Sequence, residues 1–300
     1  MTSFFPRGIG PLISVILPSR GRPEGLWNAV HQTRKHMQDK GLAEFIVKAD
    51  EDDDETVSIV KSWQATLPVK LIVSPRGRGY HDLARYTNEC CQVATGDWLL
   101  LLNDDAEIIT PEWDQVLLKT AYPNGWAGMT EICSLILTEE GVHDSYSFNA
   151  MRRQTFDVLG HYSRPGPVDY YVTTTLRGVN ATAHIEVVVR HQPNTQERHE
   201  AKITDDCYDT WWAMQQPGSV RRRLEDAEAL FQRLLVIRDE LEWSGSPIDG
   251  WNWWRRNEGA GEHGMWVCGK LAVGPSHPGF CVDLQEYTVA ELGGQWCKLR

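Results

Sequence analysis

The sequence lacks long apolar runs, regularly spaced cysteines and an excess of positive charge. Its longest apolar stretches, such as 12–17 and 98–102, are far too short to span a bilayer. The 7 cysteines include no CxxC pair, so we expect reduced thiols in a cytosolic protein rather than a disulfide framework or a zinc site. Pro6, Arg7 and Gly8 interrupt the apolar character of the N-terminal residues, so a signal peptide is not expected either.

The charge balance is acidic, because 30 Lys and Arg face 41 Asp and Glu, for a formal net charge of −11. A chain this acidic is not built around a broad surface that follows a phosphate backbone, although a local basic pocket is compatible with it. A hydrophobic share of 41% in 300 residues is enough to bury a core without disulfides or a structural metal. The composition is that of a globular protein, and it excludes membrane-spanning, fibrous and disordered classes.

In the first part of the chain, short apolar runs alternate with stretches of helical spacing. We expect strands at 12–17, 44–49, 69–73 and 98–102, and helices at 24–38, 56–65 and 80–94. Pro23 suits the start of the first helix, and Gly96 is expected to end the third. This alternation predicts an α/β fold with a mostly parallel sheet, in which ligands bind beyond the carboxyl ends of the strands.

Beyond residue 125 the pattern is less regular, with a strand expected at 185–189 and a helix at 221–243. We expect a boundary near residue 215, between the motif-bearing residues 1–215 and a helical, Trp-rich appendage at 216–300 that packs on them. Two tryptophan clusters, near this boundary and beyond it, could stack on sugars or bases. Attachment of the appendage to the domain is the simpler interpretation of both clusters.

The residues that follow the four expected strands are of two kinds. Arginines and glycines follow the first and third strands, at 18–23 and 74–80, whereas carboxylates follow the second and fourth, at 50–55 and 103–105. Arginine forks match phosphate oxygens, glycines let the backbone approach a ligand, and carboxylates hold a hard cation. One ligand that needs all of these groups is a nucleotide diphosphate with a divalent cation.

Three segments carry a resemblance to a known family: SVILPSRGRPEGL, KADEDDDET and ARYTNECCQVATGDWLLLLNDDAEI, in that order. Together they resemble the family 2-like glycosyltransferases of the GT-A fold. The third segment is the most specific, because its helix, Ala-Thr-Gly-Asp turn, apolar strand and Asp motif are consecutive. The resemblance spans residues 10–210 and implies a single GT-A type domain, with a mostly parallel central sheet flanked by helices and an acceptor-binding second half.

The resemblance also implies roles for individual residues around a donor nucleotide. The residues that would line the nucleotide pocket are Pro18, Ser19, Arg20, Arg22, Arg78 and Tyr80. Asp50 would face the base, with Asp52 as the competing choice because the acidic run blurs the register.

The segment Asn103-Asp104-Asp105 stands at the position of the family's metal-binding DxD motif. The resemblance implies that Asp105 binds Mn²⁺ or Mg²⁺, and that Asp104 reaches the ribose or a metal-bound water. Asn103 replaces the first Asp of the motif, which leaves one charge fewer there. His191 is placed like a histidine that supplies another metal ligand.

Asp169 is placed like the family's catalytic base, and the segment 148–160 like the one that closes over the donor sugar. A cation and an arginine would stabilise the departing diphosphate, while a carboxylate such as Asp169 takes the proton of the acceptor hydroxyl. If Asp169 does so, the reaction inverts the anomeric configuration. Other carboxylates that could serve are Asp144, Asp157, Asp205 and Asp206.

Each of these motifs also has a simpler structural interpretation. An Asp pair after a strand can form a turn, an acidic run can be a solvated helix start, and a histidine after a strand is often structural.

The function favoured is metal-dependent transfer of a sugar from a nucleotide-diphosphate donor, with UDP the favoured nucleotide. A nucleotidyltransferase, or a non-catalytic domain that binds a nucleotide or glycan, is the alternative. The acceptor is open among a saccharide, a lipid-linked sugar, a protein and a modified DNA base.

Overall fold

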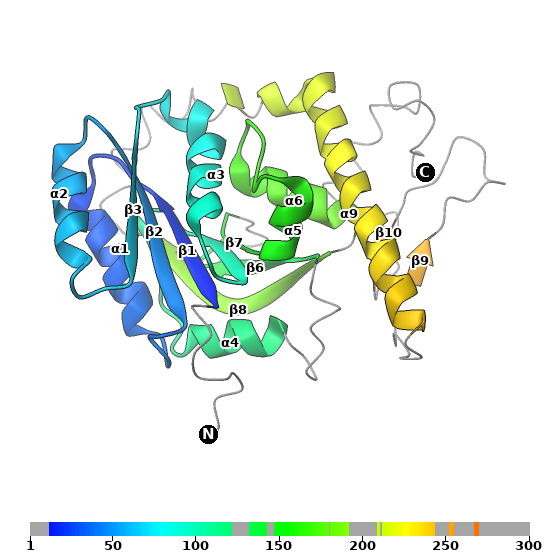
Figure 1. The fold of residues 1–300 in the computed structure, drawn as a ribbon, viewed down its shortest axis with the longest axis horizontal. Helices are drawn as coiled ribbons and strands as arrows, with labels where there is room; N and C mark the ends of the chain where they lie inside the picture. The colour runs from blue at the N-terminus through cyan, green and yellow to red at the C-terminus, as the bar shows by residue number, and fades with distance from the viewer. Residues whose placement is uncertain are drawn as a thin grey trace.

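The computed structural model describes residues 12–121, 132–142, 147–179, 181–191, 209–210, 212–243, 252–254 and 267–269. These residues form an α/β fold with one large central sheet flanked by helices (Figure 1). The strands of this sheet are β1 (Ile13–Pro18), β2 (Ala43–Asp50), β3 (Val69–Ser74), β4 (Trp98–Leu101), β5 (Ala106–Ile108), β6 (Ser134–Glu139), β7 (Asn149–Arg152) and β8 (Thr182–His191). The helices are α1 (Pro23–Lys35), α2 (Asp54–Trp63), the 3₁₀ turn η1 (Gly79–Asp82), α3 (Leu83–Val93), α4 (Trp113–Ala121), α5 (Arg153–Leu159), α6 (Val168–Gly178) and α9 (Pro217–Trp243). A separate antiparallel pair consists of β9 (Asn252–Trp254) and β10 (Val267–Gly269).

The central sheet has eight strands in the order β3-β2-β1-β4-β7-β6-β8-β5. The neighbours β3, β2, β1 and β4 are parallel, so their carboxyl ends lie along one edge. β7 is antiparallel to both β4 and β6, β8 is parallel to β6, and β5 is antiparallel to β8. The predicted α/β fold is confirmed, and the sheet is mixed, with the four predicted parallel strands forming one half of it.

The central strands bury apolar side chains on both faces of the sheet. In β1, Val15 and Leu17 belong to the apolar layer that includes residues of α1, α2 and α4. Ile16 faces the other way, into the layer with residues of α3, α5, α6 and α9. Figure 1 shows α2 at one end of the molecule and α9 towards the other. Among the described residues, no helix combines the length and the apolar character needed to cross a membrane.

Local sequence explains where α1 and α2 begin. Pro23 occupies the first turn of α1, as predicted. α2 begins after Asp53, whose side chain accepts a hydrogen bond from the backbone N–H of Thr56 at 3.2 Å. The predicted helix at 80–94 consists of η1 followed directly by α3.

Gly96 has a different role from the one predicted. α3 ends at Val93, and the extended residue Ala94 follows it, so a left-handed glycine does not end this helix. A Cβ at Gly96 would lie 2.7 Å from the backbone nitrogen of Ser14 and 2.8 Å from the carbonyl carbon of Ile13. Gly96 is therefore needed because the turn before β4 passes against the backbone at the start of β1.

Several elements of the second half were not predicted. The strands that were not predicted are β5 with 3 residues, β7 with 4 and β6 with 6. The helix α6 was not predicted either. β8 is longer than the strand predicted at 185–189, and α9 begins at Pro217 rather than at 221. Strands of three or four residues contain too few positions to establish an apolar period, so the sequence carries little signal for them.

The first half of α9 packs into the same core as the sheet. Val220, Leu224 and Phe231 are buried in the layer that also holds Phe156 of α5 and Val172 of α6. The start of the predicted appendage is thus in contact with the domain, and the boundary near residue 215 stays a prediction.

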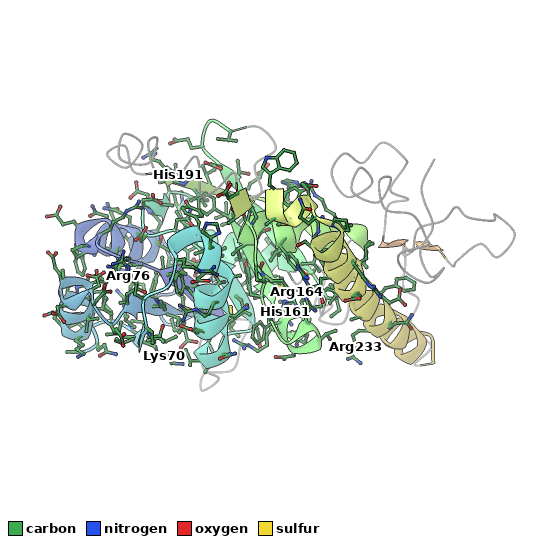
Figure 2. The ribbon with its side chains drawn as sticks, turned by 90° about the horizontal axis from the view of Figure 1, so that it is seen from above. Lys70, Arg76, His161, Arg164, His191 and Arg233 are labelled. Atoms are coloured by element: carbon green, nitrogen blue, oxygen red, sulfur yellow. The ribbon has the colours of Figure 1, made fainter. Side chains whose placement is uncertain are left out.

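Asp226 of α9 is the centre of a buried polar network. Its carboxylate, 6% exposed, accepts hydrogen bonds from Arg164 Nε at 2.9 Å and Arg164 Nη2 at 2.7 Å, and another from the Tyr171 hydroxyl. His161 Nε2 lies 3.2 Å from the same carboxylate. Figure 2 labels His161 and Arg164 close to α9. The network attaches α9 to α6 and to the segment between α5 and α6.

Replacement of Asp226 by Asn is expected to destabilise the fold by about 3 kcal/mol, because it removes the charge from a buried pair with Arg164. These partners lower the pKa of Asp226 to about 2, against the burial that raises it. The lowered pKa stabilises the fold above about pH 4, and this stabilisation is lost as the pH falls towards 2. Urea unfolding of Asp226→Asn at pH 7 and pH 3 measures both effects. Asp157→Asn, at an exposed site on α5, is the control; equal midpoints for the two variants at pH 7 would contradict the prediction.

Candidate functional site

The carboxyl ends of β1, β2, β3 and β4 place the four predicted groups of polar residues at one edge of the sheet. Pro18 pairs with Lys48, and the last residues of β2 and β3 pair with each other, so these strand ends are level. Asn103 follows β4 and forms the turn into β5, where its carbonyl accepts the N–H of Ala106 at 3.2 Å. The residues that follow these strands therefore lie close enough to interact.

Two neighbouring carboxylates at this edge share one guanidinium group. Arg22 Nη1 lies 3.2 Å from Asp104 Oδ1 and 2.8 Å from Asp105 Oδ2. Ser19 Oγ donates to the second oxygen of Asp104 at 2.8 Å. Asp104 and Asp105 are 8% and 5% exposed, so both are buried beside the loop that leads from β1 into α1. The predicted residues Ser19, Arg22, Asp104 and Asp105 thus form one cluster.

Burial and neighbouring charges both act on the carboxyl group of Asp104. It raises the pKa of Asp104 to about 6, and the charge of Asp105 adds to this effect. Arg22 and the hydrogen bond from Ser19 act in the opposite direction. The position between the two carboxylates therefore favours positive charge, which Arg22 supplies here.

The two carboxylates fit a hard divalent cation of the Mg²⁺ or Mn²⁺ type. Such a cation commonly takes one or two protein carboxylates and completes its shell with water and substrate phosphates. Among the residues that the structure describes, no three His, Cys, Asp or Glu side chains come together as a metal-binding group. Asp104, Asp105 and His191 are consequently not assembled as a preformed set of three ligands.

Beside this cluster, Arg20 joins the two candidate residues of the acidic run. Arg20 Nη1 donates to Asp50 Oδ2 at 2.7 Å, and Arg20 Nη2 donates to Asp52 Oδ2 at 3.0 Å. The Arg20 hydrogen bond lowers the pKa of Asp52, which is exposed, whereas Asp50 is 3% exposed. The structure therefore places both Asp50 and Asp52 at the site, with only Asp50 buried.

Lys48 is a buried cation at this site that the sequence analysis missed. Its ammonium group forms an ion pair with Asp50 Oδ1 and lies 3.8 Å from the centre of the Tyr86 ring. Lys48 is 1% exposed, so it depends on this carboxylate and this ring for its charge. A lysine that follows the apolar run 45–47 was the available signal, but its partner Tyr86 comes from α3.

Asp53 connects the loop after β1 to the loop after β2. Its carboxylate caps α2 and also accepts the backbone N–H of Gly21 at 2.7 Å. Gly21 has a φ of +62°, in the left-handed region that suits glycine. Asp53 was not singled out from the sequence, because a capping Asp is indistinguishable there from the other carboxylates of the run.

The loop after β3 holds its two arginines differently. Arg78 is bound to Asp82, with Nη2 2.9 Å from Oδ1, and 76% of its side chain is exposed. Arg76 extends towards the acidic run, where its Nη1 lies 3.4 Å from Asp52 Oδ2. Tyr80 is half-buried within η1. The structure brings Arg76, rather than the predicted Arg78, into contact with the residues that follow β2.

His191 lies at the end of β8, next to the turn that carries the Asp pair. It pairs with Ala106, the residue that follows Asp105. Its Nδ1 is 2.9 Å from Glu139 Oε1, and its ring centre is 5.3 Å from that of Phe148. Figure 2 labels His191 and Arg76 at separate places in the molecule. Glu139 was not selected from the sequence, where it is one of two adjacent glutamates before Gly141.

Asp169 lies in the first turn of α6 and is half-buried. Burial raises the pKa of Asp169 to about 6, backbone N–H groups at the start of the helix oppose this, and the negative charge of Glu139 raises the pKa further. A carboxyl with this pKa is ionised near pH 7 and can accept a proton. Of the competing carboxylates, Asp157 is exposed on α5, and Asp144, Asp205 and Asp206 lie outside the described residues.

Comparison with known proteins finds one matching family model and several similar structures. Residues 14–129 match the model of glycosyl transferase family 2. No curated protein matches the sequence. Among solved structures, TarS 1-349 of S. aureus in complex with UDP-GlcNAc has a TM-score of 0.52 at 15% identity, covering 79% of this chain and 74% of that one. The same TarS fragment in complex with UDP has a TM-score of 0.50 at 14% identity, covering 79% and 73%.

These matches define the fold as GT-A. The residues that match the glycosyl transferase family 2 model include the strand-end residues of β1 to β4. The resemblance indicated by the sequence motifs is therefore confirmed.

Proposed function

We propose that the protein transfers a sugar from a nucleotide-diphosphate donor, with UDP as the favoured nucleotide, to an acceptor hydroxyl, and that it uses Mn²⁺ or Mg²⁺. The observation that carries this proposal is the buried pair Asp104 and Asp105, which shares the Arg22 guanidinium at 3.2 and 2.8 Å. The family 2 match covers this pair and supports the donor class. UDP and UDP-GlcNAc, bound in the two TarS structures, support the choice of nucleotide.

The nucleotide would lie over the carboxyl ends of β1 and β2. Asp50 would face the base, held in place by Lys48 on one oxygen and Arg20 on the other. Pro18 and Ser19 would line the same pocket from β1. Tyr80 and Arg78 would approach from the loop after β3, for which Arg78 has to leave Asp82.

A divalent cation bound at this edge would neutralise the negative charge that develops on the departing diphosphate. Asp105 would bind it directly, and Asp104 would reach the ribose or a water on the cation. Arg22 contacts both carboxylates, and it would turn to diphosphate oxygens, which match its fork geometry. Asn103 carries no charge, so the first position of the DxD motif would contribute no carboxylate here.

Asp169 would act as the general base. Its carboxylate would accept the proton of the acceptor hydroxyl while the oxygen forms a bond to the anomeric carbon and the bond to the diphosphate breaks. Attack from the face opposite the leaving group inverts the anomeric configuration. The acceptor would be a saccharide, a lipid-linked sugar, a protein or a modified DNA base, and the proposed location is the cytoplasm.

A screen of nucleotide sugars for nucleotide diphosphate release, with Mn²⁺, with Mg²⁺ and with excess EDTA, tests the proposal. We expect UDP release from one UDP-sugar that stops in EDTA. Release that continues unchanged in EDTA would refute the role of the metal. Pyrophosphate release from a nucleoside triphosphate and a sugar phosphate would indicate a nucleotidyltransferase instead. Metal-dependent UDP binding in titration calorimetry, without turnover of any donor, would indicate a non-catalytic binding domain.

A further inference from the structure

Glu139 and His191 are brought together by an irregularity in the sheet. In the parallel pair β6 and β8, Leu137 pairs with Ile185, but Thr138 pairs with Val188, so the register shifts between these positions. Glu139 consequently pairs with Val189, two residues before His191. Without the shift, Glu139 would pair with a residue farther from His191. Bulges of this kind commonly re-aim a side chain next to an active site.

The His191 imidazole is held by two neighbours. Glu139 Oε1 lies 2.9 Å from Nδ1, and the side chain of Glu139 is only 12% exposed. The ring of Phe148, which is fully buried, lies against the imidazole with 5.3 Å between centres and a tilt of 47°. The pairing of His191 with Ala106 fixes the backbone position beside Asp105. The carboxylate therefore determines which ring nitrogen is engaged, and the phenyl ring restricts rotation.

This geometry determines the tautomer that can bind a metal. When Nδ1–H donates to Glu139, the lone pair is on Nε2, the nitrogen that remains for coordination. A carboxylate that accepts from the second ring nitrogen also makes the imidazole a more basic ligand and fixes its orientation. Because His191 is not preassembled with the Asp pair, its orientation matters when the donor and the cation enter the site.

We propose that Glu139 is a positioning residue, which holds His191 so that Nε2 binds the divalent cation carried by Asp105. The proposal rests on the metal-dependent function proposed above and adds a residue to it. Glu139 acts through His191, so its effect should disappear when His191 is absent. It should also depend on the ability of residue 139 to accept a hydrogen bond.

The test measures Mn²⁺ affinity of the protein with UDP, by electron paramagnetic resonance of free Mn²⁺, without any turnover. We expect Glu139→Ala to weaken Mn²⁺ binding about 10- to 100-fold. Glu139→Gln should lose less Mn²⁺ affinity than Glu139→Ala, because its amide oxygen can still accept a hydrogen bond from Nδ1–H. His191→Ala should lose at least as much Mn²⁺ affinity as Glu139→Ala. The double variant should lose no more Mn²⁺ affinity than His191→Ala alone. The matched control is Glu140→Gln, because Glu140 is the next residue, is 46% exposed and pairs with Arg190.

Two results would overturn this inference: Mn²⁺ affinity of Glu139→Ala and Glu139→Gln within twofold of the unmodified protein, or losses that add in the double variant. Asp105→Asn in the same titration separates this failure from that of the proposed function. If Asp105→Asn loses Mn²⁺ while the Glu139 variants retain it, only the role of Glu139 is wrong. If Asp105→Asn binds Mn²⁺ normally, the proposed metal site itself is wrong.

Discussion

Replacement of Asp105 by Asn is expected to reduce metal-dependent release of UDP from the donor by about 10³-fold or more, because the developing charge on the diphosphate loses its main counter-charge. Asparagine has the same shape but offers the cation no negative charge. The fold should persist, since Arg22 keeps Asp104 as an ion-pair partner. The release rate at saturating Mn²⁺, together with the thermal unfolding midpoint, measures both outcomes.

The control for Asp105→Asn is Glu107→Gln, which removes one negative charge two positions along the chain. Glu107 is half-buried in β5, and its carboxylate lies 3.9 Å from Arg190, so it is a peripheral charge. We expect Glu107→Gln to retain its activity. Full activity of Asp105→Asn, or of the unmodified protein in excess EDTA, would show that the Asp pair is a structural turn.

Replacement of Asp169 by Asn is expected to lower kcat by about 10²- to 10⁴-fold, while the affinity for UDP and Mn²⁺ stays unchanged. The amide cannot take the proton of the acceptor hydroxyl, but it preserves the start of α6. Transfer kinetics and UDP titration of the same variant separate these effects. Asp157→Asn, exposed on α5, should behave as the unmodified protein. An equal loss of UDP affinity would instead place Asp169 among the binding residues.

The pH dependence provides an independent check on Asp169. Burial raises the pKa of Asp169 to about 6, so below that pH the group is protonated and cannot act as a base. The transfer rate should therefore be low at pH 5, rise through pH 6 and level off above pH 7. The residual activity of Asp169→Asn should lack this rise.

Nuclear magnetic resonance of the product should show an inverted anomeric centre.

Much of the first half of the fold could be predicted from the sequence. The runs that form β1 and β4 are apolar, short and bounded by Pro18, Gly96 or carboxylates, a pattern typical of buried strands. The direction of the four strands then followed from the helices between them. The short strands β5 and β7 could not be predicted, because their existence depends on pairing with β8 and β4.

The candidate site also contains residues that could be predicted from the sequence and residues that could not. Ser19, Arg22, Asp104 and Asp105 could be selected because each directly follows a strand, where parallel topology places residues together. Lys48 and Glu139 could not, because their partners Tyr86 and His191 lie far from them in the chain. Arg78 was chosen over Arg76 from the sequence, but the preference of Arg78 for Asp82 follows from the turn geometry of η1.

By itself, the sequence determined the layered α/β order, the edge at which polar residues meet and the kinds of charge found there. These properties depend on the spacing of apolar residues and on the length of each apolar run, and both are properties of short segments of the chain. Only the tertiary structure decided that Arg22 lies between Asp104 and Asp105, that Tyr86 covers Lys48, and that a shift in register places Glu139 against His191. Each of these contacts joins residues far apart in the chain, and their approach is set by packing and strand pairing rather than by local preference.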